Sequence, residues 1–333
     1  MEGNQVKSKT KTLECTLCPR RCRLVEGQRG DCRVRLNLDG KLQTLVYGNP
    51  CSVHVDPIEK KPLFHVLPAT GSFSIATAGC NLHCKFCQNW QISQRVPEET
   101  QNYDLPPEKV VSEAIRAQCK SIAYTYSDPV IFFEYTLDTA KLARKAGLLN
   151  LMITAGYIEE EPLLELCPYM DAANVDLKGI TEEFYQKMSS AELAPIQKAI
   201  KIMCREGVWV EITNLVVPTW NDSEQDIRTL CQWMVDNLGP DVPLHFSRFW
   251  PMHQLKNLPP TPPETLTMAW QIAKEEGIHY TYVGNVPGHE GNNTLCPHDK
   301  KILIRRIGYQ ILENNIVDSK CRFCQTKIPG IWQ

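Results

Sequence analysis

Short apolar runs alternate with amphipathic stretches along the middle of the chain, and this alternation predicts repeated strand–helix units. The runs expected to form strands are residues 73–79, 121–126, 149–156, 171–177, 208–217, 243–249 and 279–285. Prolines open the helices and glycines close them: Pro106 and Pro107 open a helix that runs to about Cys119, and Pro129 opens one that stops at Gly147. Further helices are expected to end near Gly207, Gly239 and Gly277. The pattern predicts an α/β fold, either an open doubly wound sheet or a full or partial barrel.

Ligands of such folds bind at the C-terminal ends of the parallel strands. Cys80 begins the loop "CNLHCKFC", which follows the first predicted strand, so its cysteines should face the site. Neither a G-x-G-x-x-G turn after a strand nor a G-x4-G-K-[ST] loop is present, so dinucleotide binding and P-loop chemistry lose their usual support.

Composition and charge narrow the class of protein. A net charge of -2 gives no electrostatic field for nucleic acid. No stretch approaches the roughly 20 apolar residues that span a bilayer. The first twelve residues lack the apolar run of a secretory signal, so we expect a cytoplasmic protein. In reducing cytosol, closely spaced members among the 15 cysteines are expected to bind metal rather than form disulfides.

The cysteines fall into three groups that divide the chain. Residues 1–68 are expected to hold an N-terminal cysteine knuckle and a lead-in segment, residues 69–290 the barrel, and residues 291–333 a C-terminal knuckle-like segment. The three groups are Cys15, Cys18, Cys22 and Cys32; Cys80, Cys84 and Cys87; and Cys296, Cys321 and Cys324.

The middle group, spaced C-x3-C-x2-C, offers three thiolates where a [4Fe–4S] cluster normally takes four. One iron is then free to bind S-adenosylmethionine (SAM), and reduction of the cluster can break the sulfonium C–S bond to give a 5′-deoxyadenosyl radical. The alternative is a zinc site with a fourth ligand elsewhere, since C-x2-C is also a zinc spacing. The triplet has no second pair to match it, which favours the cluster.

The loop "GCNLHCKFCQNW" resembles the cluster loop of radical SAM enzymes. Further segments, among them "YTYSDPVIFFEY", "NVDLKG", "VEITNLVVPTWND" and "PLHFSRFWP", resemble the radical SAM enzyme of the AmmeMemoRadiSam system, which is similar in turn to pyruvate formate-lyase activating enzymes. The resemblance implies a partial radical SAM barrel, a reductant such as flavodoxin or ferredoxin, and Memo-type and AMMECR-type proteins as partners. It does not supply a substrate.

The resemblance also implies residues beside SAM. The loop from Tyr124 to Asp128 corresponds to a motif that receives the SAM amino group, although there the acid is Glu and here it is Asp. Because Asp128 precedes Pro129 at a helix start, it is equally suited to be an N-cap. The Asp-x-Lys pair of Asp176 and Lys178 is expected at SAM, with a surface ion pair as the alternative.

Two further polar residues lie in predicted strands. Glu211 shares a strand face with Thr213, and in a barrel that face is expected to line the cavity and contact SAM or substrate. His245 is likewise expected to contact SAM or substrate. Their alternatives are contacts with polar helix ends for Glu211 and a hydrogen-bonded core histidine for His245.

The terminal cysteines are expected to bind further metals. Cys15, Cys18, Cys22 and Cys32 supply four thiolates, enough for zinc or an auxiliary Fe–S cluster, and spacing does not choose between them. A third site would combine Cys296, Cys321 and Cys324 with His298. The resemblance implies a cysteine where Asp299 stands, and this departure weakens the case for that site.

Three functions fit these residues. The first is an enzyme that generates the deoxyadenosyl radical to abstract hydrogen from a substrate. The second is an activating enzyme that installs a glycyl radical on a partner protein. The third, of another class, is a non-catalytic zinc-knuckle binding protein.

Overall fold

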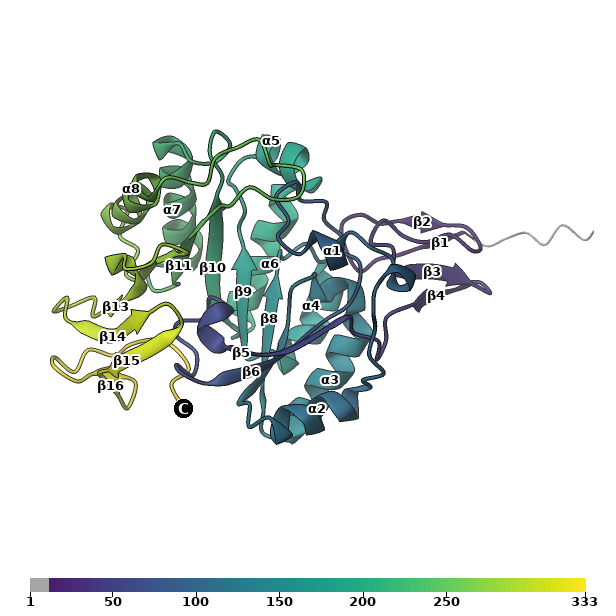
Figure 1. The fold of residues 1–333 in the computed structure, drawn as a ribbon, viewed down its shortest axis with the longest axis horizontal. Helices are drawn as coiled ribbons and strands as arrows, with labels where there is room; N and C mark the ends of the chain where they lie inside the picture. The colour runs from purple at the N-terminus through teal and green to yellow at the C-terminus, as the bar shows by residue number, and fades with distance from the viewer. Residues whose placement is uncertain (1–11) are drawn as a thin grey trace, which may run out of the picture.

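A single eight-stranded sheet forms the centre of the molecule (Figure 1). The computed structural model describes residues 12–333, so the first eleven residues, on which the prediction about a secretory signal rests, lie outside it. The sheet order is β12-β11-β10-β9-β8-β7-β6-β5; β6 to β12 are parallel, and β5 is antiparallel to β6. The strands are β5 Ser52–Pro57, β6 Gly71–Ala76, β7 Ser121–Tyr124, β8 Leu149–Thr154, β9 Ala172–Asp176, β10 Trp209–Val216, β11 Leu244–Arg248 and β12 Thr281–Gly284.

All seven predicted parallel strands are present, and β12 and β5 form two open edges, so the sheet is a partial rather than a closed barrel. Strand β5 was not predicted. It pairs with β6 from Ser52↔Ala76 to Pro57↔Gly71, which extends the main sheet beyond the range 69–290 assigned to it from the sequence.

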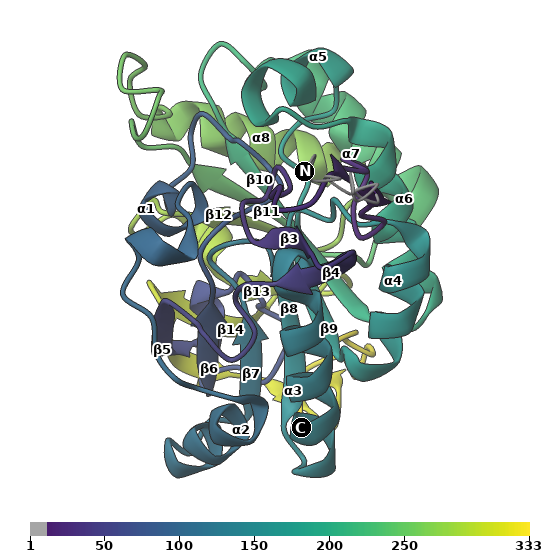
Figure 2. The same cartoon turned by 90° about the vertical axis from the view of Figure 1, so that its right-hand side faces the viewer.

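Helices cover the outer face of the sheet (Figure 2). They are α2 Pro107–Arg116, α3 Phe133–Lys145, α4 Glu160–Leu166, α6 Leu193–Arg205, α7 Glu224–Leu238 and α8 Pro263–Glu275, with the short α1 Trp90–Ser93 and α5 Glu182–Phe184. The predicted start at Pro107 and the glycine ends are confirmed, whereas Pro129 opens a 3-10 turn, Pro129–Phe132, that leads into α3; α4 was not predicted. Helix α7 is capped at its N-terminal end by Ser223, whose hydroxyl accepts from the Asp226 N–H at 3.1 Å.

Alternation along the strands separates two packing layers. Outward residues such as Ile75, Ile122 and Ile212 join the core beneath the helices. Inward residues such as Ala123 and Leu151 pack against Ile58, Leu63 and Val66 from the segment between β5 and β6. The lead-in segment therefore fills the base of the barrel, at the N-terminal ends of its strands.

Two small modules lie at opposite ends of the long axis (Figure 1). The N-terminal module holds the hairpins β1 Leu13–Glu14 with β2 Arg23–Leu24 and β3 Arg35–Leu38 with β4 Lys41–Thr44. The C-terminal module holds β13 Thr294–Leu295, β14 Ile302–Ile307, β15 Gln310–Asn314, β16 Ile316–Val317 and β17 Lys320–Cys321. Among residues 12–333, no helix combines the length and apolar character that a membrane span requires.

Candidate functional site

The loop that carries the cysteine triplet leaves the C-terminal end of β6 and runs into α1. All three thiols are free, and Cys87 Sγ lies 3.2 Å from the Ser93 hydroxyl. The loop starts at Gly79, whose φ is +89° and whose missing side chain leaves room for the Cys32 carbonyl: a Cβ there would lie 2.4 Å from that oxygen. The N-terminal module therefore packs directly against the start of this loop (Figure 2).

The surroundings of the triplet suit an iron–sulfur cluster. Burial raises the pKa of the Cys84 thiol to about 11, and the Lys178 cation offsets part of this effect. Burial also raises the pKa of Cys80 well above its usual value. Thiolates in such a site need the positive charge of bound iron.

Within the described chain, Cys80, Cys84 and Cys87 do not form a ligand group close enough for a single ion. Among residues 12–333, the only His, Cys, Asp or Glu ligand atoms gathered closely enough for a single ion are in the C-terminal module. Three thiolates, one for each of three irons, suit a cluster better than a structural zinc ion, which normally takes four protein ligands.

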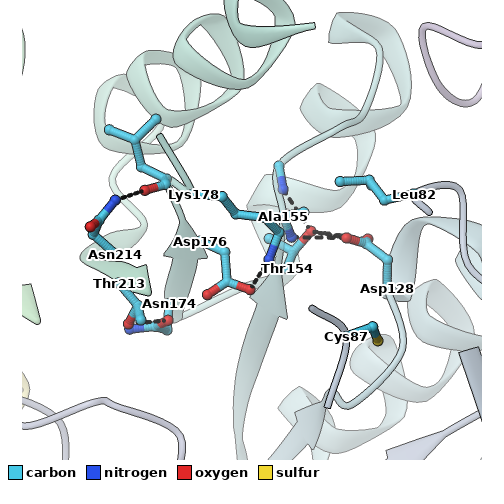
Figure 3. A network of polar contacts seen from close by, with 12 residues as sticks. Leu82, Cys87, Asp128, Thr154, Ala155, Asn174, Asp176, Lys178, Thr213 and Asn214 are labelled. Atoms are coloured by element: carbon cyan, nitrogen blue, oxygen red, sulfur yellow. Dashed lines mark hydrogen bonds and ion pairs between the residues drawn. The ribbon is translucent and has the colours of Figure 1, made fainter. Parts of the chain in front are cut away.

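Asp176 and Lys178 lie at the C-terminal end of β9, facing the cysteine loop (Figure 3). Lys178 Nζ donates to Asp176 Oδ2 at 2.7 Å and lies 5.8 Å from the centre of the Phe86 ring. Burial alone would lower the pKa of Lys178, but the nearby Asp176 and Cys84 outweigh it and raise the pKa. The Asp176 carboxylate is more than a third exposed, so a ligand can reach it. The predicted pair is thus an ion pair beside the triplet.

Asp128 is an N-cap, and both of its oxygens are occupied (Figure 3). Oδ1 accepts from the Val130 N–H at 3.1 Å, and Oδ2 accepts from the Ala155 N–H at 2.8 Å. The Thr154 hydroxyl donates to the same carboxylate at 3.0 Å. Asp128 therefore ties the loop after β7 to the end of β8, close enough to Cys80 to raise the pKa of that thiol further.

Tyr124 does not face the site. It is fully buried on the outward side of β7, where its hydroxyl donates to Asn150 Oδ1 at 2.9 Å. The Asn150 amide in turn donates to the Ala140 carbonyl of α3 at 3.0 Å. The expected contact of Tyr124 with SAM is therefore wrong, because strand alternation turns this side chain toward the helix layer.

Glu211 and His245 also lie away from the triplet, near the N-terminal ends of β10 and β11. Glu211 accepts hydrogen bonds from the Phe64 and His65 N–H groups at 3.0 and 2.8 Å. His245 Nε2 lies 2.7 Å from Oε2 of Glu211. Burial would raise the pKa of Glu211, but His245 outweighs it and lowers the pKa. His245 is therefore a hydrogen-bonded core histidine, which was the alternative interpretation. Both side chains are buried and bonded to each other, away from the cysteine loop.

A polar cluster that was not predicted from the sequence is formed by Asp56, Lys60, Lys61 and Tyr126. Asp56 lies on the inward face of β5 and accepts from Lys60 Nζ at 2.8 Å and from Lys61 Nζ at 2.5 Å. The Tyr126 hydroxyl donates to the same carboxylate. The alternation of Ser52, His54 and Asp56 with valines is the sequence signal that could have revealed an inward polar face here.

The four N-terminal cysteines share one small module. The Cys15 N–H donates to the Cys22 carbonyl at 2.9 Å, and a Cβ on Gly30 would lie 3.7 Å from Cys22 Sγ and 3.8 Å from Cys32 Sγ. Cys18 and Cys32 are buried against the same core as Cys84. Their sulfur atoms do not converge tightly enough for one ion in this part of the described chain.

The C-terminal cysteines do converge. The ligand atoms of Cys296, Asp299, Cys321 and Cys324 all lie within 4.8 Å of one another. His298 is exposed and is not part of this group, so the structure replaces it with Asp299. The physical reason is local: the Lys301 N–H donates to Asp299 Oδ1 at 3.1 Å, which leaves the other carboxylate oxygen 4.0 Å from Cys321 Sγ.

Comparison with known sequences identifies the class of protein. The profile of the Radical SAM superfamily matches residues 74–231. An uncharacterised protein of Methanocaldococcus jannaschii is 46% identical over 318 residues, or 95% of each chain. The pyruvate formate-lyase-activating enzyme of Clostridium pasteurianum is 23% identical over 161 residues, which span 46% of this chain and 64% of that enzyme. The chain belongs to the radical SAM superfamily.

Solved structures agree with this assignment at the level of the fold. A radical SAM methyltransferase from Sphaerobacter thermophilus has a TM-score of 0.53 at 16% identity, covering 69% of this chain and 70% of that one. Streptococcus suis SuiB bound to precursor peptide SuiA has a TM-score of 0.51 at 12% identity, covering 69% and 52%. The predicted radical SAM fold is confirmed, and membership implies a [4Fe–4S] cluster and SAM.

Proposed function

We propose that this enzyme uses reductive cleavage of SAM to abstract a hydrogen atom from a substrate held inside its partial barrel. The observation that carries the proposal is the cysteine triplet in the loop after β6, with Cys84 buried, Cys80 and Cys87 partly buried, and Lys178 beside Cys84. Superfamily membership supports the SAM chemistry, and the choice of substrate is the part that the comparisons leave open.

Each residue has a distinct task in this proposal. Cys80, Cys84 and Cys87 hold the cluster, which with SAM bound supplies the deoxyadenosyl radical. Lys178 and Asp176 bind polar groups of SAM from the end of β9. Asp128 fixes the loop after β7 against β8, so that the backbone from 125 to 128 keeps its position beside the cysteine loop.

Two parts of the chain, the N-terminal module and the lead-in segment, shield this site from solvent on two sides, as a radical reaction requires. On one side, Arg20 Nε donates to the Asn81 carbonyl at 3.0 Å, and His83 Nε2 lies 2.8 Å from Asp31 Oδ2, so the N-terminal module covers the cysteine loop. On the other side, the lead-in segment fills the base. The open face between these two covers is where the substrate would enter.

A second candidate is the activation of a glycyl radical enzyme. The similarity to pyruvate formate-lyase-activating enzymes favours it, although that similarity covers under half of this chain. Incubation with reductant, SAM and a candidate glycyl radical enzyme, followed by electron paramagnetic resonance, decides between the two. A glycyl doublet would place the activating function first.

Other parts of the proposal rest on the sequence resemblance alone. These are the AmmeMemoRadiSam system, its Memo-type and AMMECR-type partners, and flavodoxin or ferredoxin as reductant; the proposed cytoplasmic location rests instead on the pattern of the amino-acid sequence. Co-purification of tagged partners with this chain would test the partners.

We also propose that zinc occupies the C-terminal module. Three thiolates and one carboxylate match the ligand types of structural zinc. Cys296 and Cys321 are fully buried, and Cys296 Sγ lies 3.5 Å from Cys324 Sγ. Among residues 12–333, the four N-terminal cysteines do not form such a close ligand group. We propose that they bind either zinc or an auxiliary cluster.

The main proposal is tested on anaerobically reconstituted protein. With dithionite and SAM it should release 5′-deoxyadenosine, and Cys84→Ala should abolish the release. Cys204→Ala is the matched control, because Cys204 lies in α6 among packed side chains and is expected to keep the activity. A zinc-only protein without acid-labile sulfide would support the non-catalytic class instead.

A further inference from the structure

A hollow of about 270 Å³ lies between the edge strand β5 and the cysteine loop. Its lining includes Ser52 and His54 from β5, Lys60 from the lead-in segment, Asn89 and Ile92 from the cysteine loop and α1, and Tyr126 from the loop after β7. The hollow is open to solvent on one side and polar over much of its wall.

The position of the hollow connects it with the interior of the barrel. Ser52 and His54 pair with Ala76 and Ser74 of β6, on the same strand face as Asp56. Asn89 follows Cys87 by two residues, and its side-chain amide donates to the Tyr126 carbonyl at 2.9 Å. The hollow therefore adjoins both the cysteine loop and the loop that Asp128 fixes.

The charge of the wall favours an anion. Lys60 and Lys61 both bond to the single carboxylate of Asp56, so two cations share one negative charge. Lys61 is only 2% exposed and lies 4.3 Å from the centre of the Tyr126 ring, whereas Lys60 is 45% exposed and reaches the hollow. No lining residue is acidic.

The remaining side chains are also suited to an oxyanion. The Ser52 hydroxyl can donate a hydrogen bond, and His54 can donate from its ring. The His54 ring packs edge-on against Tyr126 at 5.9 Å, which orients it along the wall. Charge-assisted hydrogen bonds from Lys and His to carboxylate or phosphate are among the strongest that a polar site can make.

We propose that this hollow binds the oxyanion group, a carboxylate or a phosphate, of the substrate whose hydrogen is abstracted. That the occupant is the substrate rests on the proposed function. That the occupant carries an oxyanion rests on the residues that line the hollow. Lys60 and His54 bind the anion, and the rest of the substrate extends past Asn89 toward the cysteine loop.

The test measures anion binding directly and needs no SAM cleavage. Isothermal titration calorimetry on the reconstituted protein, with SAM present at saturation, uses inorganic phosphate and malonate as separate probes. At least one probe should bind saturably, and preference between them tells phosphate from carboxylate. Lys60→Gln and His54→Gln should each weaken binding by about tenfold or more.

The control is Lys109→Gln, which removes an exposed lysine that is paired with Asp104 at 3.0 Å and lies outside the hollow. It should bind the probe as the unmodified protein does. Three results would overturn the proposal: no saturable binding of either probe, equal binding by the Lys60→Gln and His54→Gln proteins, or binding of the probe only in a parallel titration without SAM, which would assign the hollow to SAM's own carboxylate. None of them depends on whether SAM is cleaved, so this proposal and the proposed function fail separately.

Discussion

Lys178 Nζ lies 2.7 Å from Asp176 Oδ2 at the end of β9, and the same ammonium group lies beside Cys84. A charged group in this position can bind SAM only if it stays ionised, and the carboxylate keeps it so. Removing a charged hydrogen bond to a buried partner costs about 1.5–3 kcal/mol, which is about ten- to a hundredfold in affinity. Lys178→Ala and Asp176→Ala should weaken SAM binding by this amount while the iron content stays unchanged.

Equilibrium binding of SAM to reconstituted protein measures the effect. Lys187→Ala is a suitable control, because Lys187 also bonds to a carboxylate, Glu183 at 2.6 Å, but on the surface. Unchanged affinity in both site variants would make the pair a purely structural ion pair.

Asp128→Glu tests whether this carboxylate acts through the fold or through SAM. The longer side chain cannot keep its bonds to both Val130 and Ala155, whose N–H groups it now bonds at 3.1 and 2.8 Å. Loss of an N-cap typically costs about 1 kcal/mol. We expect a lower thermal midpoint and no gain in SAM affinity. A variant that binds SAM more tightly at unchanged stability would show instead that the carboxylate faces the SAM amino group.

Gly79→Ala should disrupt the junction between the cysteine loop and the N-terminal module. The new Cβ would lie 2.4 Å from the Cys32 carbonyl oxygen in a backbone conformation with φ +89°. The expected result is a loss of stability above about 2 kcal/mol, with reduced iron content after reconstitution.

The matched change is Gly147→Ala after α3, where φ is +75° but nothing lies within 4 Å of the new Cβ. Gly147→Ala should lower the free energy of unfolding only by the cost of the backbone strain, about 1 kcal/mol. Equal losses in the two variants would mean that the contact with Cys32 does not matter.

His65 should make the barrel base sensitive to acid. Its Nδ1 donates to the Pro329 carbonyl and its Nε2 accepts from the Tyr282 hydroxyl, both at 2.7 Å, so the ring is held neutral. Burial lowers the pKa of His65 to about 4 from its usual 6.5. Between these two pKa values, His65 binds a proton in the unfolded chain but stays neutral in the native protein. The free energy of unfolding should therefore fall as the pH drops from about 6.5 to about 4.

The size of this effect is about 3 kcal/mol over that window. The thermal midpoint of the unmodified protein should drop between about pH 7 and about pH 5. The drop should be smaller in His65→Gln, whatever the absolute stability of that variant. An identical pH dependence in both proteins would assign the acid sensitivity to other groups.

Asp299 is predicted to complete the C-terminal zinc site. Asp299→Cys should keep zinc more firmly, because a thiolate is the softer ligand, while Asp299→Ala should release zinc to a chelator at least about tenfold faster. Metal content after dialysis against a chelator measures both. His298→Ala serves as the control, since His298 lies outside the ligand group. Zinc loss in His298→Ala alone would reverse this assignment.

The sequence predicted the parts of the fold that local pattern determines. The seven parallel strands are apolar runs bounded by turn residues, and the C-x3-C-x2-C spacing lies within a single loop. Asp176 and Lys178 are close in sequence, so the sequence could also place them together at the end of β9, where Lys178 Nζ lies 2.7 Å from Asp176 Oδ2. Their expected contact with SAM stays a prediction.

The errors came from contacts across long stretches of chain. The expected roles of Glu211 and His245 depended on what occupies the barrel base, and Phe64 and His65, about 146 residues earlier, fill it. The sequence likewise could not show that the Lys301 N–H orients Asp299 toward the cysteines. Strand β5 was missed because its inward positions are polar, so its alternation did not resemble a core strand.

The bond between His65 and Pro329 joins residues that are 264 positions apart. A ribosome adds about 5–20 residues per second, so His65 waits on the order of tens of seconds for its partner. During synthesis the loop that holds the cysteine triplet emerges early, whereas the base of the barrel closes last. A newly made chain is therefore expected to leave His65 and the Val66 backbone, which pairs with Ile331, uncovered until then. This interval is when chaperone binding or aggregation would compete with folding.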